Sequence, residues 1–112
     1  MPESSVTPTH RPVYRIDRFN VPAHALSAFM ERLRHTQNVL DEQPGCRQNL
    51  VLTQADLAGE FNVMTMVEWS DESALSAAKA VMQQRYMQER FDPAAFMQGL
   101  GVQADLGFYR SE

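Results

Sequence analysis

The ten residues from 60 to 69, EFNVMTMVEW, constrain the fold of this chain more than any other segment. Successive residues of a β-strand point to opposite faces of its sheet. One face of this segment carries Phe61, Val63, Thr65, Val67 and Trp69, and the other carries Asn62, Met64, Met66 and Glu68. Because neither face is fully polar, a strand formed here needs cover on both sides.

The rest of the chain alternates between strand-like and helix-like patterns. Strands are predicted at residues 12–20, 46–54, 60–69 and 102–109, and helices at 22–43, 70–90 and 93–99. Pro44-Gly45 ends the first helix, Ser70 is the expected N-cap of the second, and Asp92-Pro93 begins the third. The order β-α-β-β-α-β predicts an α+β, ferredoxin-like fold with an antiparallel four-stranded sheet and helices on one face.

Helices on one face leave the other face of that sheet uncovered. The third strand places Met64 and Met66 there. A second copy of the same sheet is the simplest cover for an apolar face. We therefore expect a homodimer, in which two sheets form a dimeric α/β barrel.

Composition excludes several classes of protein. The chain has 112 residues, of which 44% are hydrophobic and 21% charged, and this length suits one domain. The formal charge is −4, the basic residues are scattered, and no run approaches the ~20 apolar residues of a membrane span. We expect a mobile tail over residues 1–11, one domain over 12–112, no nucleic-acid or membrane partner, and a cytoplasmic location.

Two segments resemble the antibiotic biosynthesis monooxygenase family. Residues 67–75, VEWSDESAL, join a strand ending in Trp to a helix beginning with Ala-Leu, and residues 39–46, VLDEQPGC, resemble the exit of the family's first helix. The resemblance covers about residues 12–110. It implies a dimeric α/β barrel with a pocket between the sheet and the helices of each subunit. Some members oxidise aromatic polyketides or quinols with molecular oxygen and no metal or flavin, and others degrade haem.

Some family positions carry different residues here. The Asn of the polyketide-oxidising members is replaced by Thr65, and the Glu that often precedes the Trp by two positions is replaced by Val67. Haem-degrading members use an Asn, a Trp and a His, whereas this chain has Asp17 near the Asn position and neither Trp nor His within 71–90. The three His residues are dispersed, and the single Cys46 excludes an intramolecular disulfide. We expect no metal and no cofactor.

Asp17, Thr65 and Trp69 are the candidate catalytic residues. Asp17 alternates with apolar neighbours, so a pocket-facing carboxylate with a raised pKa could deprotonate a phenol or quinol. A structural ion pair, for example with an Arg of the second copy, is the alternative. The Thr65 hydroxyl and the Trp69 indole could orient a substrate, although both residues also suit a strand or a core.

Arg15, Phe29, Met82 and Tyr86 are the candidate substrate-binding residues. Arg15 shares a strand face with Asp17, and the others lie on the apolar stripes of the first two helices. Leu26 belongs to the same stripe and is also expected to line the pocket. Ordinary core packing is the alternative for the apolar side chains. Glu31, Arg32, Arg34, His35 and Asn38 are predicted on the opposite, solvent side of the first helix.

The resemblance implies a cofactor-independent monooxygenase that oxidises an aromatic, quinol- or polyketide-like molecule. The alternative is a non-catalytic barrel protein that binds an apolar or aromatic small molecule. A cavity lined only by Met, Leu, Phe and Ala would favour binding, whereas polar groups aimed inward would favour chemistry. A third possibility, an isomerase or lyase on the same fold, has no residue in its favour.

Overall fold

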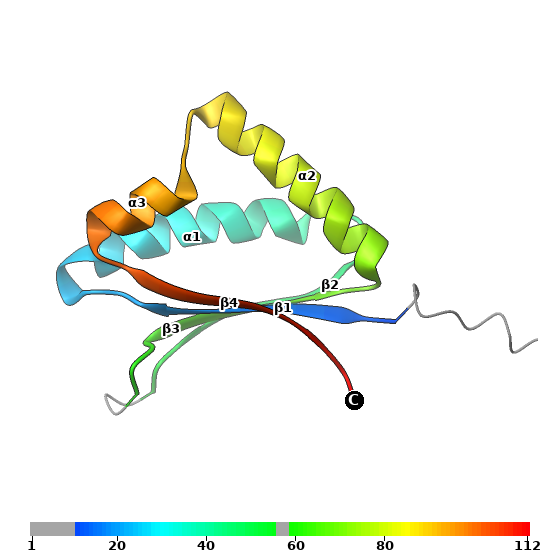
Figure 1. The fold of residues 1–112 in the computed structure, drawn as a ribbon, viewed down its shortest axis with the longest axis horizontal. Helices are drawn as coiled ribbons and strands as arrows, with labels where there is room; N and C mark the ends of the chain where they lie inside the picture. The colour runs from blue at the N-terminus through cyan, green and yellow to red at the C-terminus, as the bar shows by residue number, and fades with distance from the viewer. Residues whose placement is uncertain (1–10, 56–58) are drawn as a thin grey trace, which may run out of the picture.

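The computed structural model describes residues 11–55 and 59–112, which form one sheet covered by helices on one face (Figure 1). In chain order the elements are β1 Val13–Asn20, a 3-10 helix Ala23–Ala25, α1 Leu26–Asp41, β2 Cys46–Thr53, β3 Val63–Trp69, α2 Glu72–Glu89, α3 Pro93–Leu100 and β4 Gln103–Arg110. The predicted α+β, ferredoxin-like order is confirmed. None of these helices has the length and apolarity that crossing a bilayer requires.

The four strands lie in the order β2-β3-β1-β4, and all neighbours are antiparallel. β1 is therefore a central strand, with β3 on one side and the edge strand β4 on the other. Its residue Asp17 lies opposite Thr65 of β3 and Leu106 of β4. This register places three side chains in one row beneath the helices, because paired residues of neighbouring strands point to the same face.

The helix-side face of the sheet carries two separate apolar clusters. Around one end lie Phe19 and Phe29, whose ring centroids are 5.0 Å apart. At the other end Val13 packs with Trp69 and their neighbours. Along β1 the residues between Val13 and Phe19 on this face are charged, so the core is interrupted in its middle.

The third strand begins three residues later than predicted. The Asn62 side chain accepts a hydrogen bond from the Val21 N–H and donates one to the Val21 carbonyl, each 2.9 Å long. These bonds compete with a regular strand pairing. Phe61, expected beside Val63, instead lies outside β3, with the Arg18 guanidinium 4.5 Å from its ring centroid.

The two long helices also begin differently from the prediction. Residue 22 starts no α-helix, because Pro22 provides no side-chain cap and the first turn is a 3-10 helix. The N-cap of α2 is Asp71, which accepts a 2.8 Å bond from the Ala74 N–H, rather than Ser70. The Ser70 N–H still belongs to the strand end, since it donates to the Gly45 carbonyl at 2.8 Å. The predicted Asp92 cap of α3 is confirmed.

The opposite face of the sheet is uncovered in this single chain. Its apolar side chains are Tyr14, Ile16, Leu50, Leu52, Met64, Met66 and Tyr109. Leu52 keeps 46% of its surface exposed and Tyr109 keeps 50%. The apolar second face predicted from residues 60–69 is therefore present. Of the expected tail, residues 1–10 lie outside the described part. The same holds for residues 56–58, within the hairpin loop that the sequence predicts at 55–59.

Gly45 lies in the tight turn between α1 and β2. Its φ of 86° lies in the left-handed region, and an added Cβ would lie 2.5 Å from the Ala74 Cβ and 2.7 Å from the Ser70 Oγ. The close approach of this turn to the start of α2 therefore requires glycine.

We expect Gly45→Ala to lower the free energy of unfolding by more than about 2 kcal/mol, because strain in φ adds to the overlap with Ala74. Urea unfolding measures the loss. Gly99→Ala is the matched control, since Gly99 is helical and a Cβ there meets no atom within 4 Å. That change should leave stability equal or slightly higher. Equal tolerance of both substitutions would contradict the prediction.

Candidate functional site

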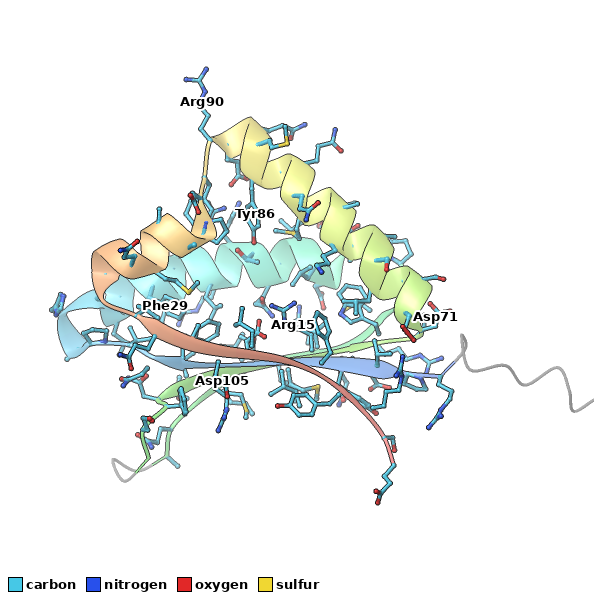
Figure 2. The ribbon with its side chains drawn as sticks, viewed as in Figure 1. Arg15, Phe29, Asp71, Tyr86, Arg90 and Asp105 are labelled. Atoms are coloured by element: carbon cyan, nitrogen blue, oxygen red, sulfur yellow. The ribbon has the colours of Figure 1, made fainter. Side chains whose placement is uncertain are left out.

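A cavity of about 350 Å³ lies between the sheet and the helices, where the apolar core is interrupted. α2 meets the sheet near its N-terminal end and rises away from it toward its C-terminal end (Figure 1). Figure 2 shows Arg15, Phe29 and Tyr86 directed into the space between the two layers. All the candidate residues from the sequence line this cavity: Arg15, Asp17, Phe29, Thr65, Trp69, Met82 and Tyr86.

An ion pair forms the floor of the cavity. The Arg15 Nε donates to the Asp17 Oδ1 at 2.6 Å, and the two side chains are 26% and 17% exposed. They lie on the same face because they are two residues apart on a strand. Asp17 thus has the ion pair expected as the alternative, but its partner is on the same strand rather than in a second copy.

Burial raises the pKa of the Asp17 carboxyl above its ordinary range, although Arg15 and a hydrogen bond from the backbone of Gly107 act in the opposite direction. Desolvation is thus the larger effect. A carboxylate with a raised pKa is a stronger base than an exposed one, and this carboxylate faces a cavity.

Thr65 and Trp69 form the β3 side of the site. Thr65 is 3% exposed and lies directly across from Asp17. Trp69 is 1% exposed and packs within the apolar cluster that contains Val13 and Ala78. The indole therefore belongs to the core and to the cavity wall at once, which combines the two interpretations that the sequence left open.

The helices cover the cavity with apolar side chains and with the phenol of Tyr86, and we call this cover the roof. Phe29 of α1 and Met82 of α2 are almost fully buried. Burial raises the pKa of the Tyr86 hydroxyl, against the opposing effects of a hydrogen bond with Thr36 and the charge of Arg32. Tyr86 is therefore protonated at neutral pH and can donate a hydrogen bond. Leu26, expected in the same lining, is 38% exposed and lies outside it.

Arg32 of α1 also lines the cavity, contrary to its predicted solvent-side position. Its guanidinium lies 3.5 Å from the centroid of the Phe91 ring and bonds to the Glu89 carboxylate at 2.7 Å. Its Nε is buried without a hydrogen-bond partner. The spacing could have revealed this, because Arg32 follows Phe29 by three positions and so lies on the same helix face.

Lys79 of α2 is a second lining residue that the sequence did not single out. It follows Leu75 by four positions and precedes Met82 by three, so it belongs to the same helical stripe. At the far end of the lining, the Gln37 Nε2 donates to the Asn49 Oδ1 at 2.8 Å. Within residues 11–55 and 59–112, no three His, Cys, Asp or Glu side chains gather closely enough to hold a metal ion.

Residues 12–90 match the sequence model of the antibiotic biosynthesis monooxygenase family. Comparison with curated proteins finds no match. Among solved structures, the chain is similar to SnoaB, a cofactor-independent oxygenase from Streptomyces nogalater, at 20% identity and a TM-score of 0.69, over 91% of this chain and 94% of that one. The chain is also similar to a candidate monooxygenase from Shewanella loihica PV-4, at 22% identity and a TM-score of 0.70, over 91% of this chain and 95% of that one. Likeness at this identity shows the shared fold.

The Asp17 carboxyl should titrate above the ordinary range of an Asp, and Arg15→Met should raise its pKa further by removing the paired cation. Carbon-13 NMR titration measures both values. Arg34→Met, on the outer side of α1, is the control and should leave the pKa unchanged. Because the pKa of Asp17 is raised in the folded state, ionisation of this carboxyl destabilises the fold. The free energy of unfolding should therefore be higher while Asp17 is protonated and fall as pH rises through the folded-state pKa. A pKa below the ordinary range in the wild type would contradict the prediction.

Proposed function

Because the chain belongs to the antibiotic biosynthesis monooxygenase family, we propose that it is a cofactor-independent monooxygenase that oxidises an aromatic, quinol- or polyketide-like molecule with molecular oxygen. One observation carries the proposal. The Arg15–Asp17 pair lies opposite Thr65 on the floor of a cavity whose walls are largely apolar. Such a site combines a base of raised pKa with space for an aromatic ring.

The reaction can be balanced with dioxygen as the only oxidant. A phenol gives its hydroxyl proton to a base, and the phenolate passes one electron to O₂. The resulting radical and superoxide combine at the para ring carbon, and the peroxide is protonated. Loss of that carbon's proton and of hydroxide, together one water, leaves a quinone. The ring loses four electrons and O₂ takes up four, one oxygen atom entering the product and the other the water.

Asp17 is the proposed base of this sequence. It accepts the hydroxyl proton and returns it to the peroxide, while Arg15 holds its carboxylate in place on the cavity floor. Thr65 and Trp69 orient the ring from the β3 side. Phe29, Met82 and Tyr86 enclose it from the helices and exclude water from the radical pair.

The polar floor favours catalysis over the alternative of a non-catalytic binding protein. A cavity built for binding alone has no need of a buried carboxylate whose ionisation costs stability. Arg15, Asp17 and Thr65 instead point inward together from adjacent strands.

The uncovered face of the sheet supports the proposal of a homodimer. Apolar side chains from all four strands form one continuous surface there, from Leu52 of β2 across Met64 and Ile16 to Tyr109 of β4. Contiguous exposed apolar patches mark interaction sites, and a second copy offers the same patch with two-fold symmetry. The dimeric barrel and the cytoplasmic location stay predictions.

With anthrone as substrate, we expect the protein to consume O₂ faster than buffer alone, with chelator present, and to incorporate one labelled oxygen atom per anthraquinone. Asp17→Asn should lower kcat by about a hundredfold or more, because a positioned base contributes at least this much. An oxygen electrode and mass spectrometry measure the two effects.

Asp41→Asn is the matched control for that loss, since Asp41 is exposed at the end of α1 and does not line the cavity. Its activity should equal that of the wild type. If anthrone, naphthol and hydroquinones are all consumed no faster than in buffer, the proposed oxygenase is wrong.

For the dimer, we expect the wild type to sediment as two copies at micromolar concentration and Met66→Lys to sediment as one. Met66 lies between Ile16 and Leu50 at the centre of the open face, so a charge there would be buried at the interface. Ala77→Lys, on the exposed side of α2, adds the same charge and should leave the dimer intact. A monomeric wild type would overturn the dimer.

A further inference from the structure

Three cationic side chains line the cavity, and two of them have a carboxylate partner. Arg15 pairs with Asp17, and Arg32 pairs with Glu89. Lys79 forms no ion pair with any residue that the structure describes, although it lines the same cavity. The cavity therefore carries one positive charge, that of Lys79, that no carboxylate of the site neutralises.

Lys79 lies at the outer end of the cavity, where α2 faces the edge strand β4. Its side chain is exposed, whereas Met82, three residues later, is buried inside. Across from it, Leu106 of β4 lines the cavity and is 51% exposed. Because both residues line the cavity and are exposed, we call this side of it, between α2 and β4, the mouth.

Phe108 holds two of the cations together at this mouth. The Lys79 Nζ lies 5.6 Å from the centroid of the Phe108 ring, and the Arg15 Cζ lies 4.7 Å from it. Attraction to one aromatic ring stabilises both cations despite their mutual repulsion. Phe108 is itself 54% exposed, so the core gives no reason for an aromatic residue here.

We propose that Lys79, positioned by Phe108, binds a carboxylate group carried by the aromatic substrate, so that the substrate is an aromatic acid rather than a neutral polycycle. The aromatic part of this inference rests on the proposed function. The carboxylate part rests on the unbalanced charge of Lys79 and on its place at the mouth of the cavity.

The geometry separates two ends of one ligand. The reacting hydroxyl belongs beside Asp17, in the row that Asp17 forms with Thr65 and Leu106. The carboxylate belongs in the next row, where Arg15 and Phe108 are paired across β1 and β4 and Lys79 of α2 also contacts the Phe108 ring. Arg15 connects the two ends of the site, because it pairs with Asp17 and also lies against Phe108. Binding of the substrate carboxylate at Lys79 would therefore also set the distance between the substrate ring and Asp17.

Naphthoate and naphthamide test the charge preference, because they share one shape and differ in charge. Neither probe is a substrate for oxidation by the proposed route, so calorimetric binding is independent of turnover. We expect the wild type to bind naphthoate about three- to tenfold more tightly than naphthamide at low salt, as a partly exposed, charge-assisted contact gives. Added salt should weaken naphthoate alone.

Lys79→Met should remove most of that preference and leave the naphthamide affinity within about twofold, because the stem of the side chain is retained. Lys79→Arg should restore the preference. Phe108→Leu should reduce the preference for naphthoate over naphthamide, since Lys79 then loses the aromatic ring that positions it. Arg85→Met is the matched control: Arg85 is an exposed cation on the same helix that does not line the cavity, and its loss should change neither affinity.

An unchanged preference in Lys79→Met would overturn the proposal, and so would an equal loss in Arg85→Met, which would indicate a bulk effect of net charge. Failure of the wild type to bind either probe would overturn it as well. A protein that consumes no O₂ with anthrone but prefers naphthoate through Lys79 would reject the oxygenase and retain the carboxylate site, so the two proposals fail separately.

Discussion

The Arg15–Asp17 ion pair is the interaction on which the rest of the structure depends. It occupies the middle of β1, where an apolar pair would join the two clusters around Phe19 and Trp69 into one core. Burying two charges is costly unless each has partners. Here the pair faces a cavity of about 350 Å³ rather than packed side chains, so the interruption of the core and the existence of the site have the same cause.

The two faces of β1 belong to different surfaces of the molecule, because successive residues of a strand point to opposite sides of the sheet. Odd-numbered residues such as Arg15 and Asp17 face the cavity, whereas Ile16 and Tyr14 belong to the open apolar face. The proposed chemistry and the proposed dimer therefore occupy opposite sides of one sheet. A substitution on one face changes the other only through the backbone that they share.

Local patterns were enough to predict most of the residues that line the cavity. The alternation of β1 places Arg15 and Asp17 on one face, and helical spacing places Phe29, Met82 and Tyr86 on the helix faces that cover the cavity. The same spacing places Arg32 and Lys79 on the cavity side, but it does not by itself predict a lining role, because charged residues on a helix are usually solvated. Helical spacing also predicts Leu26 in the lining, but this first residue of α1 is exposed and lies outside it.

The sequence by itself determined the order of the elements, the two-sided third strand and the face of each strand residue, because alternation and helical periodicity act between near neighbours. Only the tertiary structure decided that Asp17 pairs with Arg15, that burial raises the pKa of the Asp17 carboxyl, and that Lys79 and Arg15 both lie against one Phe108 ring. Pairing and desolvation depend on strand register and on what packs above the strand, and both bring together residues far apart in the chain.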